Sequence, residues 1–247
     1  MIGKSLQTRG VMNHKKLILS LFSSLLALCF LFACLFYFCS YYKAVGVEKY
    51  FVSNDEVKVE QTHDWYYFDG KGTQKALVFY PGARVESKAY APLMYRLAQE
   101  GVDCYLMIMP FHMAIFGVNA ADKVVGDSHE SWYLGGHSMG GAMAASYVNG
   151  ADQDIDGLVL LAAYSASDLK ARGVPALSVY GDRDGVLNRE KVNSGRDYFS
   201  DYTEKVIFGG NHAQFGSYCE QAGDNPAAIS DEEQLALTVR YILEFVQ

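Results

Sequence analysis

The sequence GGHSMGG, residues 135–141, places four glycines around Ser138, directly after the apolar residues 132–134. A short apolar run that ends in glycine predicts a buried strand, and residues 139–148 are compatible with a helix. Ser138 is therefore expected on a sharp turn from a strand into a helix. Residues 136–140 match the pattern G-x-S-x-G, and in this context the pattern predicts a nucleophile elbow.

The glycines have a physical reason at such a turn. A serine there adopts strained backbone angles, and side chains at Gly136 and Gly140 would collide with the neighbouring strand and helix. The backbone N–H of Met139, at the start of the helix, points toward the place where an oxyanion would form. A hydroxyl is a weak nucleophile until an imidazole takes its proton and a carboxylate orients that imidazole. We therefore expect a histidine and an acid further along the chain.

Two polar loops downstream offer these groups. Residues 180–186, YGDRDGV, contain Asp182 and Asp184, and residues 209–216, GGNHAQFG, contain His212. Each loop follows a predicted strand, and open parallel sheets place their ligands at the carboxyl ends of the strands. The order serine, aspartate, histidine is one of the known triad orders.

The rest of the chain alternates apolar runs with segments of helical spacing. Strands are predicted at residues 76–80, 102–109, 131–134, 157–163, 176–180 and 205–208, and helices at 87–99, 139–148, 188–199 and 230–247. This alternation predicts an α/β fold with a doubly wound, mostly parallel sheet and helices on both of its faces. Residues 56–60 and 63–68 are expected to add antiparallel edge strands.

The three ordered motifs resemble those of the α/β-hydrolase superfamily, in the compact form related to dienelactone hydrolases and small esterases. The resemblance covers roughly residues 76–247. In that family the acid usually stands three residues after the glycine that closes its strand, as in G-x-x-D-x-x-V. Counted from Gly181, this implies Asp184 as the acid and leaves Asp182 as the alternative, although the family's valine then falls on Leu187.

The resemblance also implies an oxyanion hole. The first turn of the family usually reads His-Gly, and the next residue supplies a backbone N–H to the oxyanion. Here residues 80–83 read YPGA, so that Pro81 departs from the pattern without removing the donor. By resemblance, Ala83 is the second oxyanion contact beside Met139.

Three further residues are candidates for the rim of the site. Arg84, beside the first turn, could receive an anionic group of the substrate, or it is a solvated loop charge. Gln214 and Phe215 lie in residues 211–229, a long stretch without clear periodicity that forms either the rim or an ordinary surface loop. Residues 164–173 are too few for a cap domain, which favours an open cleft for small or partly exposed esters.

The remaining histidines are weaker candidates for the base. His137 cannot curl back onto the hydroxyl of the next residue and is expected to pack beneath the turn. His112 is expected to be a packing or hydrogen-bonded residue. The sequence offers no supporting context for His14, His63 and His129.

Residues 17–42 form an apolar run without a charge. As a helix, at about 1.5 Å per residue, the run reaches about 39 Å, which exceeds the roughly 30 Å hydrocarbon core of a bilayer. This predicts a membrane anchor between a short segment, 1–16, and a catalytic domain, 43–247. A cleaved signal peptide and a lipid-modified Cys34 are the alternatives. The first segment carries only basic charges, at Lys4, Arg9, Lys15 and Lys16. The amino terminus is therefore expected in the cytoplasm and the catalytic domain outside it.

The composition of the chain argues against several classes of partner and binding site. Half of the residues are hydrophobic, which is ample for a packed core. The net charge is −7 and all 28 acidic residues follow the apolar run, which argues against nucleic acid and against an anionic membrane surface as partners. The five cysteines do not have the spacing of a disulfide framework or a zinc site, although a single bridge between Cys104 and Cys219 is conceivable.

The sequence thus predicts a membrane-anchored serine hydrolase that acts on a small ester-like substrate. Ser138 would attack, His212 would act as base and Asp184 would orient it. No metal or organic cofactor is implied. A thioesterase, a peptidase or an acyltransferase would use the same groups, and a catalytically silent binding protein on this scaffold is the alternative from another class.

Overall fold

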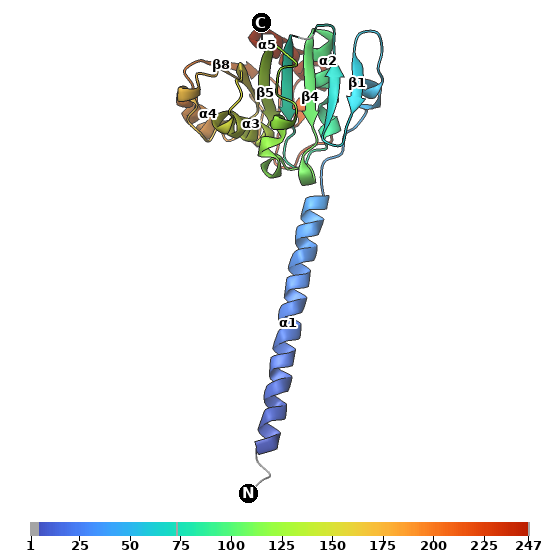
Figure 1. Cartoon of the computed structure of the whole chain (residues 1–247), viewed down its shortest axis with the longest axis vertical. Coiled ribbons are helices and arrows are strands. Elements are labelled where there is room, and N and C mark those ends of the chain that lie inside the picture. Colours follow the sequence, from blue (N-terminus) through green and yellow to red (C-terminus); the bar gives the residue numbers. More distant parts are fainter. Residues whose placement is uncertain (1–4, 73, 247) are drawn as a thin grey trace. The chain divides into compact units, whose positions relative to one another are not determined.

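The computed structural model describes residues 5–72 and 74–246, and the chain forms two compact units, Met1–Ser40 and Tyr41–Gln247 (Figure 1). The first unit is one helix, α1 (Ser5–Cys39). Its residues His14–Tyr37 are long and apolar enough to cross a membrane, with a mean hydropathy of 2.5 and no burial. Residues 1–4 of the predicted basic segment lie outside the described residues, as does Gln247 of the predicted last helix.

The helix ends before the boundary predicted for the anchor. Residue 42 was expected to be the last residue of the span, but α1 stops at Cys39 and Tyr41 begins the second unit. Tyr42 forms an isolated parallel bridge with Val85, and its backbone N–H donates to the carbonyl of Arg84 at 2.7 Å. The prediction extended the span to residue 42 because residues 40–42 carry no charge, and composition alone does not mark the end of a helix.

The second unit contains an eight-stranded sheet in the order β1-β2-β4-β3-β5-β6-β7-β8. The strands are β1 (Lys58–Gln61), β2 (Trp65–Asp69), β3 (Lys75–Tyr80), β4 (Val102–Met107), β5 (Ser131–His137), β6 (Gly157–Leu161), β7 (Ala176–Gly181) and β8 (Tyr202–Ile207). Strand β2 pairs antiparallel with both β1 and β4, and the pairs from β4 to β8 are parallel. The predicted α/β fold with a mostly parallel sheet and antiparallel edge strands is confirmed.

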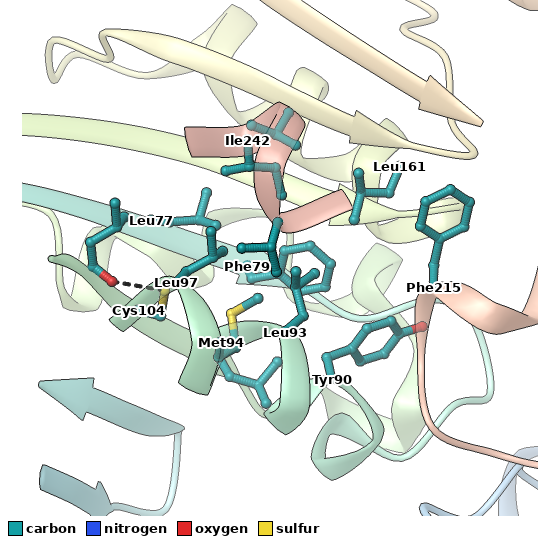
Figure 2. Close-up of a cluster of buried hydrophobic side chains, with 14 of the residues drawn as sticks. Leu77, Phe79, Tyr90, Leu93, Met94, Leu97, Cys104, Leu161, Phe215 and Ile242 are labelled. Carbon is teal, nitrogen blue, oxygen red and sulfur yellow. Dashed lines mark hydrogen bonds between the residues drawn. The ribbon is translucent and has the colours of Figure 1, made fainter. Parts of the chain in front are cut away.

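Helices cover both faces of this sheet. The helices of the second unit are α2 (Ala91–Gln99), α3 (Met139–Gly150), α4 (Arg189–Gly195) and α5 (Asp231–Phe245). Leu77 and Phe79 of β3 belong to a core cluster with residues of α2 and α5, whereas Val78 and Tyr80 belong to a cluster with residues of α3. Because side chains alternate along a strand, a strand with both faces covered is apolar throughout. Figure 2 shows the first cluster, with Leu93 of α2 near Phe79.

Among the connections between consecutive strands from β3 to β8, those between β4 and β5 and between β6 and β7 contain no α-helix. The first contains three short 3-10 turns, Pro110–His112, Ala114–Phe116 and Val118–Lys123. Residues 162–175 form the second, with a single 3-10 turn at Lys170–Arg172. Cys104 and Cys219 are both free, so the conceivable disulfide bridge between them is not formed.

Candidate active site

Ser138 occupies the turn between β5 and α3 in a strained conformation, with φ 54° and ψ −122°. A residue with a side chain rarely adopts a positive φ, and such a conformation costs on the order of 1–3 kcal/mol. The backbone N–H of Ser138 donates to the carbonyl of Leu161 at 2.9 Å, which fastens the turn to the neighbouring strand β6. The serine side chain is half-buried. This is the geometry predicted for the elbow.

The glycines allow the close packing of this turn. A Cβ atom on Gly136 would lie 2.5 Å from the carbonyl carbon of Gly140 and 2.6 Å from the nitrogen of Gly141. A Cβ atom on Gly140 would overlap with the carbonyl oxygens of Tyr80 and Pro81, at the end of β3. Backbone atoms cannot move aside as a flexible side chain can. The glycines therefore permit the strand, the helix and the turn after β3 to meet at Ser138.

His212 follows β8 and forms a hydrogen bond with an aspartate after β7. Its Nδ1 lies 2.8 Å from Oδ2 of Asp184, and both side chains are buried. The other carboxylate oxygen of Asp184 accepts hydrogen bonds from the backbone N–H groups of Val186 and Leu187, each at 2.8 Å. These bonds fix the carboxylate. The Nε2 atom of His212 is buried and has no hydrogen-bond partner among the described residues.

Asp182, the alternative acid, has a different partner. Its Oδ1 accepts a hydrogen bond from the backbone N–H of Gly209 at 2.6 Å, which links the loops after β7 and β8. The structure thus pairs the histidine with Asp184 and gives Asp182 a backbone partner in the loop after β8.

Ser138 and His212 line the same cavity, whose volume is about 340 Å³. The cavity lies at the carboxyl edge of the sheet, among the loops after β5, β6, β7 and β8. Its other lining residues are mostly small or apolar: Met139, Ala142, Ala162, Ala163, Tyr164, Val186, Leu187 and Asn188. Ser138 and a histidine with an unpartnered ring nitrogen therefore line one space that has room for a small group.

The two expected oxyanion donors lie on turns that pack together. Met139 is the first residue of α3, so its backbone N–H has no partner within the helix. Ala83 follows the turn at Tyr80 and Pro81 that touches Gly140, and β3 and β5 align Tyr80 with Gly136. Among the described residues, no hydrogen bond uses the backbone N–H of Met139 or Ala83.

Residues 76–236 match the family model of the alpha/beta hydrolase family. The chain belongs to this family. The match includes the elbow, both loops and the turn after β3, and it gives the hydrolase assignment a basis independent of the site geometry.

Solved structures of the same fold include Est1E from Butyrivibrio proteoclasticus, with a TM-score of 0.55 and 13% identity over 78% of this chain and 99% of that one. TT1662 from Thermus thermophilus has a TM-score of 0.58 and 12% identity over 78% of this chain and 99% of that one. Naproxen esterase from Bacillus subtilis has a TM-score of 0.54 and 11% identity over 81% of this chain and 94% of that one. At this identity the likeness shows the fold. The search of curated proteins gave no match.

The hydrolase has a buried polar network beneath the elbow that the sequence reasoning missed in part. The Oη atom of Tyr90 lies 2.8 Å from Nδ1 of His137 and accepts a hydrogen bond from the backbone N–H of Gly82 at 3.0 Å. The ring of His137 lies 4.4 Å from that of His212. Burial lowers the pKa of His137 well below its usual range, and the nearby His212 lowers it further. His137 packs beneath the turn, as expected, and its lowered pKa keeps the ring neutral. Nothing in the sequence singled out Tyr90, because it resembles an ordinary core position.

The predicted rim residues of the hydrolase do not line the cavity at Ser138. Phe215 is only 3% exposed and packs in the core, where its ring lies 5.6 Å from that of His137. Gln214 lines other cavities and donates through Nε2 to the carbonyl of Ile229. Arg84 has a positive φ of 57°, and its backbone N–H donates to the carbonyl of His112. The long stretch after His212 folds back on itself, which a periodicity argument does not detect.

The structure places no group of three His, Cys, Asp or Glu side chains within reach of a common metal ion, as far as the described residues extend.

Proposed function

We propose that the chain is a membrane-anchored serine hydrolase that cleaves a carboxylic ester through an acyl-enzyme. One observation carries the proposal. Ser138, on its strained turn, and His212, whose Nε2 has no partner, line one cavity, while Asp184 holds the opposite nitrogen of the histidine ring. A buried histidine without a partner is costly, unless a reacting group completes its hydrogen bonds.

The chemistry follows from these positions. Nε2 of His212 takes the proton of Ser138 while the serine oxygen bonds to the acyl carbon, and the carbonyl electron pair moves onto oxygen. The N–H groups of Met139 and Ala83 would stabilise that oxyanion, and Asp184 would stabilise the imidazolium. The tetrahedral intermediate then expels the alcohol, which takes the proton from His212. Water repeats the sequence on the acyl-enzyme and releases the acid.

The cavity supports a small acyl or alcohol group. Ala142, Ala162 and Ala163 leave space beside Ser138, and the volume of about 340 Å³ lies at the lower end of ligand pockets. The connection from β6 to β7, residues 162–175, is too short for a cap domain. One neighbour of the same fold is named as an esterase, which favours an ester over the thioester or peptide that the same groups could attack.

The anchor part of the proposal has its own support. Helix α1 contains a stretch long and apolar enough to cross a membrane, and the basic residues before it favour a cytoplasmic amino terminus. Residues 43–247 would then lie outside the cytoplasm. Protease added to intact cells should digest this domain, whereas a fully protected domain would contradict the orientation.

Covalent labelling tests the nucleophile. Full-length protein in detergent micelles should react with a fluorophosphonate probe, and Ser138→Ala should abolish the labelling. Ser128→Ala is a matched control, because the Oγ atom of Ser128 also lies close to a histidine, 2.9 Å from Nδ1 of His129. Labelling of Ser138→Ala equal to that of the parent would remove Ser138 as nucleophile.

A series of p-nitrophenyl esters tests the substrate class. Short acyl chains should be hydrolysed faster than long ones, because the cavity is small. Preference for long chains would contradict the proposed cavity. Labelling without hydrolysis of any ester would direct the search to thioesters, peptides or acyl acceptors.

A further inference from the structure

Exposed apolar side chains gather at one edge of the second unit. Phe111, Ile115 and Phe116 follow the carboxyl end of β4 and are 61%, 51% and 53% exposed. The rings of Phe111 and Phe116 lie 5.9 Å apart. Because β4 and β5 both belong to the parallel part of the sheet, their carboxyl ends lie at the same edge, where Ser138 follows β5. Clustered exposed apolar side chains usually mark a binding surface.

The end of the apolar amino-terminal run is fastened to this edge. Tyr41, at the end of that run, belongs to the second unit, and its ring lies 3.8 Å from the ring of His112. The backbone of the next residue, Tyr42, donates to the carbonyl of Arg84, whose N–H donates to the carbonyl of His112, each at 2.7 Å. Aromatic residues at the end of a membrane span commonly lie at headgroup depth. Covalent continuity therefore brings the loop after β4 close to the membrane surface, whatever the direction of the helix.

The composition of this loop suits a lipid environment. Residues 108–121 contain no Asp, Glu, Lys or Arg, although the chain as a whole has a net charge of −7. Burial lowers the pKa of His112, so this side chain is neutral near pH 7. Residues 110–118 are hereafter called the β4 loop. Because these residues carry no formal charge, the β4 loop can enter the membrane interface without the cost of removing a charge from water.

Several backbone N–H groups of the β4 loop already form hydrogen bonds within the loop, which favours a lipid environment. The N–H groups of Met113, Phe116 and Gly117 donate to the carbonyls of Pro110, Met113 and Ala114 at 3.0, 3.1 and 3.0 Å. A backbone N–H that enters lipid without a partner costs several kcal/mol, of order 2–7. Together with the N–H of His112, which donates to the carbonyl of Met109 at 3.1 Å, these bonds satisfy part of the loop's backbone donors and lower the cost of insertion.

We propose that the β4 loop inserts Phe111, Ile115 and Phe116 into the leaflet from which the anchor emerges. The partner is the bilayer itself, and the contact is apolar, because the acidic domain does not favour anionic lipids. The edge of the sheet that holds Ser138 and His212 then lies at the headgroup layer. This inference rests on the anchor of the proposed function, and it does not depend on the chemistry of Ser138.

Depth-dependent quenching tests the inserted loop. The full-length protein, with Phe111→Trp or Phe116→Trp, is placed in phosphatidylcholine nanodiscs whose acyl chains carry bromine. The fluorescence added by each new tryptophan, relative to the parent with Trp65 and Trp132, should be quenched at least twofold by the brominated lipid. Glu130→Trp is the control, because Glu130 is exposed and precedes β5 at the opposite edge. Its added fluorescence should be unaffected.

Quenching of Phe111→Trp and Phe116→Trp no greater than that of Glu130→Trp would overturn the inserted loop. Failure of the parent chain to enter nanodiscs would overturn the anchor, and with it this inference. Fluorophosphonate labelling of the same samples reports separately on Ser138. Normal quenching without labelling would contradict the serine chemistry alone, and each tryptophan variant that is labelled like the parent is correctly folded.

Discussion

The molecule contains two buried pairs of histidine and aspartate that look alike in isolation. At the carboxyl edge of the sheet, Nδ1 of His212 lies 2.8 Å from Asp184. At the amino edge, where β4 and β5 begin, Nε2 of His129 lies 3.0 Å from Asp103. The exposures of the side chains are 1% and 0% in the first pair and 3% and 0% in the second.

The partners of the two pairs differ. Asp103 also accepts hydrogen bonds from the hydroxyl of Tyr67 at 3.0 Å and from the N–H of Gly70 at 2.9 Å. The other ring nitrogen of His129 lies 2.9 Å from Oγ of Ser128. This pair thus forms a closed network between β2, β4 and the start of β5. In the pair at His212 the second nitrogen is buried and has no hydrogen-bond partner among the described residues, and His212 lines a cavity together with Ser138.

This difference teaches that a serine, a histidine and an aspartate at hydrogen-bonding distances do not by themselves make a catalytic site. The residues Ser128, His129 and Asp103 meet that criterion. Ser128 has no strained backbone conformation and does not precede a helix, and the three residues do not line any of the cavities described above. The simplest role for them is therefore to link strands. The same pair supports chemistry only where one nitrogen stays without a protein partner and faces room for a substrate.

The largest expected effect distinguishes the two aspartates near His212. Asp184→Asn should lower ester turnover about 10⁴-fold, because the amide leaves the imidazole in the wrong tautomer. Asp182→Asn should change turnover little, since Asp182 bonds the backbone of Gly209. Steady-state hydrolysis of a p-nitrophenyl ester measures both. A greater loss in Asp182→Asn would reverse the assignment of the acid.

The next largest effect is on stability and concerns the pair of His129 and Asp103. Asp103→Ala should lower the free energy of unfolding by about 3–5 kcal/mol, because it leaves His129, Tyr67 and Gly70 without their shared acceptor. Turnover of the remaining folded enzyme should stay near that of the parent. Urea unfolding in detergent micelles measures the stability. Asp154→Ala, at an exposed carboxylate, is the control, and unchanged stability in Asp103→Ala would show that the network does not link the strands.

The two pairs also differ in their neighbours, which predicts a dependence on pH. His137 packs beside His212 with a lowered pKa, whereas His129 packs against Trp132 with 4.8 Å between ring centres. Below a pH of about 6.5, the imidazole of His137 binds a proton in the unfolded chain but stays neutral in the folded chain. The free energy of unfolding therefore decreases as the pH falls, by up to about 1.4 kcal/mol per pH unit. His137→Gln should reduce this slope between pH 6.5 and 5 in urea unfolding. A slope equal to that of the parent would mean that His137 accepts a proton in the folded state.

The smallest expected effect concerns Tyr90, which contacts the residues that pack beside His212 and the oxyanion turn. Tyr90→Phe removes the acceptor of the Gly82 N–H and the partner of His137, which should lower turnover about tenfold if one net hydrogen bond of about 1.4 kcal/mol positions the oxyanion turn. Tyr95→Phe is the matched control, because its hydroxyl accepts a hydrogen bond from Asn54 on the surface. Equal turnover in the two variants would show that Tyr90 serves the core alone.

The sequence alone determined the fold and the positions of the candidate groups. Apolar runs located every parallel strand to within a few residues, since strands buried on both faces must be apolar throughout. The spacing of glycines around Ser138 predicted the turn, because only glycine fits where backbone approaches backbone. Local rules of this kind need no knowledge of distant contacts.

Only the tertiary structure decided which side chains meet. It placed Phe215 in the core, put Tyr90 beneath the elbow, joined His129 to Asp103 and gave Asp182 the backbone of Gly209 as its partner. Each of these contacts joins segments that are far apart in the chain. The sequence around each residue contains no pattern that identifies its partner. Strand order and register bring them together, and the energy of a buried polar group depends on the partners that this packing supplies.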